Sequence, residues 1–298
     1  MNEILRTPEN FFSDLPDFPF EPHYLEDLPG FDGLRMHYLD EGPRDAETVF
    51  LCLHGQPTWS YLYRKMLPVF TAAGHRVVAP DFFGFGRSDK PTDESVYTFE
   101  FHRASLITFV ERLGLSNITL VAQDWGGLLG LTIPMDDAQR YSRLVVMNTS
   151  LATGETALPP AFLAWRAWSA KNPDMAIGRL MGRSCPDLSA RELAAYDAPF
   201  PDIRYKAGVR RFPDLVPDHP DAPGAALSRR AARWWSAQWA GPTLMAIGME
   251  DPVLGPPVMQ ALRKVIQGCP PPLEIAESGH FVQESGGWLA EEILKAFD

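Results

Sequence analysis

The sequence predicts an α/β fold in which a mostly parallel, doubly wound sheet carries an inserted helical cap. Short apolar segments typical of strands alternate with segments of helical periodicity along most of the chain. The alternation stops between residues 153 and 223, where prolines separate short helical pieces, and then resumes. We therefore expect a core formed by residues 1–152 and 224–298 and a helical cap formed by residues 153–223.

The first part of the core is expected to start with an antiparallel hairpin. Residues 24–28 and 34–40 alternate in polarity and are separated by turn signals, whereas residues 48–53 form a continuous apolar run typical of a strand buried on both faces. The elements expected next are a helix over 61–73, a strand over 76–80, a glycine-rich loop over 81–89, a helix over 98–113, a strand over 118–122, a helix over 126–133 and a strand over 143–147.

The cap and the second part of the core follow. Helical pieces such as 161–171 and 190–196 are expected in the cap, without a strand. The core then continues with a helix over 228–239, a strand over 243–247, a helix over 257–265, a strand over 273–277 and a helix over 287–297. In such sheets, reactive groups gather at the carboxyl ends of the strands.

Composition excludes several classes of protein. The chain has 45% hydrophobic residues and a formal net charge of -11, so it lacks the basic surface expected for binding to nucleic acid or anionic membranes. No segment approaches the roughly eighteen apolar residues of a membrane span, and the N-terminus lacks an apolar signal region. The cysteines, Cys52, Cys185 and Cys269, show no metal or redox spacing. We expect a cytoplasmic monomer without metal or cofactor.

The turn after residues 118–122 has the pattern of a nucleophile elbow. In that motif, small residues two positions before and after the nucleophile let a strained corner close, and Ala122 and Gly126 flank Asp124 in this way. An Asp at such a junction is more often a helix N-cap. The glycines Gly126 and Gly127 and a later histidine favour a nucleophilic carboxylate, which attacks carbon directly and forms an alkyl ester.

Hydrolysis of that ester requires a base, and His280 is the candidate. It lies in Glu-Ser-Gly-His-Phe just past the last expected strand. His54 also follows a strand, but its His-Gly-Gln-Pro turn favours a loop-anchoring role. The other histidines are expected at the surface or in the hairpin: His23, His37, His75, His102 and His219.

An acid should hold the other nitrogen of the imidazole, and Asp251, after the strand 243–247, is the candidate. The adjacent Glu250 could be confused with it, and a solvated loop acid is the alternative for either residue. Asn148 follows the strand 143–147 and cannot supply the charge.

These motifs together resemble the haloalkane dehalogenases of the α/β-hydrolase superfamily over nearly the full chain. The resemblance implies hydrolytic dehalogenation of small haloalkanes to alcohol, halide and a proton, as in detoxification, through an ester on Asp124 hydrolysed by water that His280 activates. It rests on His54-Gly55-Gln56-Pro57-Thr58-Trp59, residues 81–89, Gln123-Asp124-Trp125-Gly126-Gly127, Gly248-Met249-Glu250-Asp251 and Gly279-His280-Phe281.

The resemblance also implies an Asp-His-Asp triad and two halide-binding indoles, Trp125 and Trp165. Trp165 lies on the first expected cap helix, where packing is the alternative role. The backbone N–H groups of Gln56 and Trp125 would form the oxyanion hole, although an acidic residue or Asn is commoner at position 56. Apolar pocket walls are expected from Phe162, Phe212, Pro213, Val253 and Leu254.

Two other functions remain open. An epoxide hydrolase shares the Asp nucleophile but protonates the opening oxygen with cap tyrosines, for which Tyr196 and Tyr205 are candidates. A non-catalytic binding protein on the same scaffold is the other. A dehalogenase of the fluoroacetate type is disfavoured because Trp125, and not Arg, follows Asp124. The expected partners are a small apolar halogenated substrate, water and halide.

Overall fold

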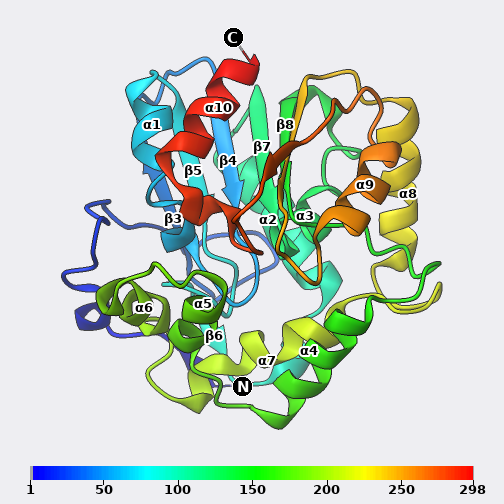
Figure 1. The fold of residues 1–298 in the computed structure, drawn as a ribbon. Coiled ribbons are helices and arrows are strands. Elements are labelled where there is room, and N and C mark those ends of the chain that lie inside the picture. Colours follow the sequence, from blue (N-terminus) through cyan, green and yellow to red (C-terminus); the bar gives the residue numbers. More distant parts are fainter. Residues whose placement is uncertain (1–2, 298) are drawn as a thin grey trace.

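The computed structural model describes residues 3–297, and its centre is a twisted sheet (Figure 1). The sheet has eight strands in the order β10-β9-β8-β7-β4-β5-β3-β2. The six strands from β4 to β10 in this sheet are parallel, whereas β2 and β3 form the predicted antiparallel hairpin at one edge. Their bounds are β2 His23–Leu25, β3 Met36–Glu41, β4 Val49–Leu53, β5 Arg76–Pro80, β7 Ile118–Gln123, β8 Tyr141–Met147, β9 Thr243–Gly248 and β10 Leu273–Ile275.

Helices cover both faces of the sheet, which confirms the predicted fold class. In Figure 1, α1 and α10 pack side by side in front of the sheet, and α2 and α3 lie behind it. α8 packs beside α9. The bounds of these helices are α1 Leu67–Ala72, α2 Phe99–Arg112, α3 Trp125–Gly130, α8 Ala225–Ala237, α9 Pro256–Val265 and α10 Gly287–Phe297.

The helix predicted over residues 61–73 is wrong in its first half. A short 3-10 helix, η2, spans Ser60–Tyr63, and the α-helix α1 begins only at Leu67. Pro68 explains the break, because proline has no backbone N–H and suits the first turn of a helix but not its interior. By contrast, α2 starts where predicted, after Thr98, whose hydroxyl accepts a hydrogen bond from the Phe101 N–H at 3.0 Å.

Among the described residues, four α-helices between β8 and α8 lie at the lower end of the sheet in Figure 1. The sequence predicts α4 and α6 closely but does not single out α5 or α7. Gly178 and Gly182 lie in α5, and Pro213 lies inside α7, so both segments lack a clear helical pattern. Their bounds are α4 Pro160–Lys171, α5 Ile177–Ser184, α6 Ala190–Asp197 and α7 Ala207–Leu215.

A small second sheet was not predicted. β1 (Ile4–Leu5) pairs antiparallel with β6 (Lys90–Pro91), and Arg6 forms two hydrogen bonds of 2.8 Å with Asp89 beside it. Two-residue strands are too short to show a period in the sequence. Among residues 3–297, no helix is long and apolar enough to cross a membrane.

Candidate active site

Asp124 occupies a strained corner between β7 and α3. Its φ of 49° lies in the left-handed region that side chains other than glycine rarely adopt. The corner is closed tightly: a Cβ at Gly126 would lie 2.1 Å from the Leu53 carbonyl oxygen, and one at Gly127 would lie 2.1 Å from the Thr149 hydroxyl. Only glycine fits at either position, as expected for an elbow.

The Asp124 carboxylate does not cap the helix that follows it. One of its oxygens, Oδ1, accepts a hydrogen bond of 2.7 Å from the backbone N–H of Gln56, in the loop after β4. Gly55 lets this loop lie close to Asp124, because a Cβ at position 55 would lie only 2.4 Å from Asp124 Oδ1. The helix-cap role considered for Asp124 is therefore wrong, and the carboxylate lines a cavity.

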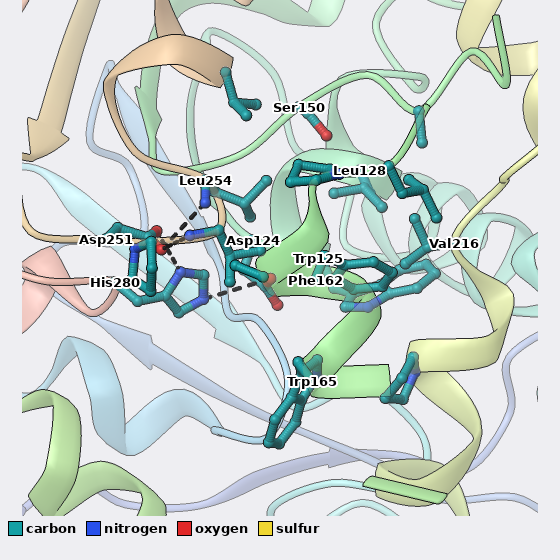
Figure 2. A pocket seen from close by; sticks show the side chains of 18 of the residues that line it. Asp124, Trp125, Leu128, Ser150, Phe162, Trp165, Val216, Asp251, Leu254 and His280 are labelled. Atoms are coloured by element: carbon teal, nitrogen blue, oxygen red, sulfur yellow. Dashed lines mark hydrogen bonds and ion pairs between the residues drawn. The ribbon is translucent and has the colours of Figure 1, made fainter. Parts of the chain in front are cut away.

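His280 and Asp251 reach the same place from two further strand ends. His280 follows β10 and Asp251 follows β9. The imidazole Nδ1 lies 2.7 Å from Asp251 Oδ2, and Nε2 lies 3.5 Å from Asp124 Oδ2. Figure 2 shows His280 between the two carboxylates. Glu250, the alternative acid, is exposed to solvent.

Asp251 is buried but fully supplied with hydrogen bonds. Its Oδ1 accepts from the backbone N–H groups of Val253 at 2.8 Å and Leu254 at 3.1 Å, and its Oδ2 accepts from the Asn148 amide at 3.0 Å. Burial alone would raise the pKa of Asp251, but the charge of His280 and these donors outweigh it and lower the pKa. The sequence excluded Asn148 as an acid but gave no sign that it would donate to one.

The pKa of His280 is raised by its neighbours. Burial alone would lower it, but the negative charges of Asp251 and Asp124 outweigh burial and raise the pKa to about 10. The resting imidazole is therefore protonated at neutral pH. Its contribution to folding stability is complete below the ordinary pKa of 6.5 and is lost as the pH rises through about 10.

The site opens into a cavity of about 950 Å³ with mostly apolar walls. Trp125 and Trp165 both line it, and Figure 2 shows Asp124 between His280 and Trp125. Within residues 3–297, neither indole N–H donates a hydrogen bond to the protein. The Trp165 ring stacks on Trp168 at 5.4 Å between centroids, so it also has a packing contact.

Four of the five predicted wall residues line the cavity: Phe162, Pro213, Val253 and Leu254. Phe212 does not, and its prediction as a wall residue is wrong. Phe212 is fully buried, and its ring centroid lies 4.7 Å from that of Trp125 and 4.6 Å from that of His102. Its ring therefore packs against the Trp125 ring. His102, expected at the surface or in the hairpin, is buried in α2.

The remaining loop residues have structural contacts. The Gln56 amide donates to the Val209 carbonyl at 3.1 Å, so this side chain ties the loop after β4 to α7. His54 is buried, and its Nε2 accepts a hydrogen bond of 3.0 Å from the Phe82 N–H. This contact joins the loops after β4 and β5, in keeping with an anchoring role for His54.

A carboxylate at a strand-to-helix corner, with a histidine and an acid at neighbouring strand ends, defines an α/β-hydrolase site, and the alpha/beta hydrolase fold family matches residues 48–287. A haloalkane dehalogenase from Psychrobacter cryohalolentis is 45% identical over 99% of this chain and 98% of its own, and one from Mycolicibacterium paratuberculosis is 44% identical over 98% and 97%. A tetrameric haloalkane dehalogenase from Paraglaciecola agarilytica superimposes with a TM-score of 0.96 at 54% identity, covering 98% of both chains. The chain belongs to the haloalkane dehalogenases, hydrolases that act on carbon–halogen bonds.

Nitrogen-15 NMR of the imidazole should show that His280 of the resting protein stays protonated through neutral pH and titrates near 10. Asp251→Asn should lower this pKa, because one of the two negative charges beside the ring is removed. Glu250→Gln, which removes the neighbouring exposed charge, should leave it unchanged. A wild-type titration near the ordinary value of 6.5 would contradict the electrostatic description of the site.

Proposed function

We propose that the chain performs hydrolytic dehalogenation through Asp124 as nucleophile. The observation that carries the proposal is the state of this carboxylate: it lines an apolar cavity, one oxygen is held by a single backbone N–H, and the helix behind it does not use it as a cap. Attack on the halogenated carbon forms a carbon–oxygen bond on Asp124 while the carbon–halogen bond breaks and the halide leaves with the electron pair.

The second step hydrolyses the ester. Esterification removes the charge of Asp124, so the pKa of His280 falls and the ring can give up its proton. His280, held by Asp251, then takes a proton from water as the water attacks the ester carbonyl. The Gln56 N–H already bonds Asp124 Oδ1, and with the Trp125 N–H it would stabilise the oxyanion there. The bond between the carbonyl carbon and the alkoxide oxygen then breaks, and the alkoxide takes the proton from His280 and leaves as the alcohol. Asp124 keeps the oxygen that came from water and loses the remaining proton to solvent, which restores the carboxylate.

Trp125 and Trp165 are the proposed halide ligands. Each places an indole on the cavity wall with an N–H that has no acceptor within residues 3–297. An indole donates a hydrogen bond but supplies no acidic proton, so it stabilises the departing halide without protonating Asp124. The apolar walls exclude water and strengthen both interactions.

The two other functions have less support. Tyr196, one candidate proton donor of an epoxide hydrolase, is fully buried and its hydroxyl bonds Glu284; neither it nor Tyr205 lines the cavity. A non-catalytic protein would be expected to lack one of the groups Asp124, His280 and Asp251, and all are present within contact distance.

We further propose that residues 153–223 act as a cap over a core of residues 1–152 and 224–298. Residues of α4, α5 and α7 line the cavity together with residues of the sheet ends, so this segment sets the size of the substrate. The cytoplasmic location and the monomeric state stay predictions, and the similar protein of Paraglaciecola agarilytica is described as a tetramer.

Incubation with 1,2-dibromoethane tests the reaction. The purified protein should release bromide and protons in equal amounts, because hydrolysis yields alcohol, halide and a proton. Styrene oxide should not be opened, and Asp124→Asn should release no bromide. Turnover of styrene oxide without bromide release from short bromoalkanes would instead support an epoxide hydrolase.

Trp165→Phe tests the second halide ligand. Loss of one hydrogen bond to an anion should weaken bromide binding by roughly tenfold or more. It should also slow cleavage of the carbon–bromine bond, because the departing halide is less stabilised. Quenching of tryptophan fluorescence by bromide gives the affinity. Trp288→Phe, which changes an exposed indole on α10, should alter neither quantity. Unchanged bromide affinity and turnover in Trp165→Phe would assign Trp165 to packing alone.

A further inference from the structure

Gln123 precedes Asp124 at the end of β7, and its fully buried side chain contacts His280 rather than the cavity. The amide nitrogen Nε2 donates to the His280 backbone carbonyl at 3.0 Å. The same nitrogen lies 3.0 Å from Nε2 of the His280 ring. That ring nitrogen is the one that faces Asp124 and would accept a proton from water in the second step.

Neighbouring groups fix which end of the Gln123 amide faces the ring. The Tyr63 hydroxyl donates to the Leu53 carbonyl at 2.8 Å, so it accepts from the Gln283 amide nitrogen at 3.4 Å. The Gln283 nitrogen also donates to Gln123 Oε1 at 3.4 Å. A reversed Gln123 amide would place its oxygen against the His280 carbonyl oxygen and its nitrogen against that of Gln283. A donor therefore faces the imidazole.

This donor distinguishes the two protonation states of His280. An amide N–H can bond ring Nε2 only when that nitrogen carries a lone pair, as in the neutral ring with its proton on Nδ1 beside Asp251. In the imidazolium, two N–H groups would face each other at 3.0 Å. The ion pairs to the ring within residues 3–297 come from Asp124 and Asp251, and both favour the charged form. Gln123 opposes them.

We propose that Gln123 is a positioning residue that stabilises the neutral, proton-accepting form of His280 after Asp124 has been esterified. At that stage Asp124 no longer carries a charge, so the Gln123 donor becomes the strongest polar contact of Nε2 until water arrives. The donor also holds the ring against Asp251 in the tautomer that the second step requires. This inference rests on the proposed ester mechanism.

Single-turnover kinetics across pH tests the inference with Gln123→Met, which keeps the length of the side chain but removes the donor. With 1-bromobutane, halide release reports ester formation, and butanol appearance reports ester hydrolysis. The acid limb of ester hydrolysis should move to higher pH by roughly half to one unit, the shift that one hydrogen bond to the neutral ring provides. Ester formation should change by no more than about twofold.

Two further variants keep the test decisive. Thr119→Val, also on β7, replaces a buried hydroxyl that has no hydrogen-bond partner among residues 3–297, and it should shift neither step. Gln283→Met should shift the acid limb in the same direction by a smaller amount, because it removes the hydrogen bond that orients the Gln123 amide but leaves the contact of that amide with the ring. This variant replaces Gln123→Met in the test if Gln123→Met does not fold. An acid limb that stays in place or moves to lower pH overturns the role of Gln123. Absence of ester formation in the wild type would instead overturn the proposed mechanism.

Discussion

The closed corner at Asp124 is the constraint on which the site depends. The positive φ of Asp124 turns its carboxylate away from the amides of α3, which would otherwise bind it as a cap. The corner can hold this conformation because Gly126 and Gly127 let it lie directly on Leu53 and Thr149, and because β4 and β7 are buried along their whole length. The buried sheet thus holds the strained backbone of Asp124 in place and leaves its carboxylate free to react.

The two carboxylates beside His280 differ in their surroundings, and this difference suits them to different roles. Asp251 receives two backbone N–H groups and the Asn148 amide, so its charge is stabilised and its position fixed. Asp124 has one backbone donor and an open cavity on its other side. His280 thereby has a permanent partner on Nδ1 and, on Nε2, a partner whose charge disappears during the proposed reaction.

The sequence predicted the strands of the main sheet, its hairpin and the approach of Asp124, His280 and Asp251. Buried strands have a clear pattern, and parallel topology brings their carboxyl ends together. The prediction failed where contacts between distant parts of the chain determine the role of a side chain. Phe212 lies in α7 next to Pro213, which obscures the helical pattern of this segment, so the sequence could not show that the Phe212 ring faces Trp125 and not the cavity. Asn148 and Gln123 look like ordinary polar residues at strand ends, and only the folded chain shows that they donate to Asp251 and His280.

Mass spectrometry of the Asp124 peptide in His280→Gln, saturated with 1-bromobutane, tests nucleophilic catalysis most directly. Without the base, the ester should form and persist, and the peptide should gain the mass of one butyl group on Asp124. Glu250→Gln, which keeps His280, should not accumulate the ester. A folded His280→Gln protein that binds the substrate and leaves Asp124 unmodified would contradict the proposed role of Asp124.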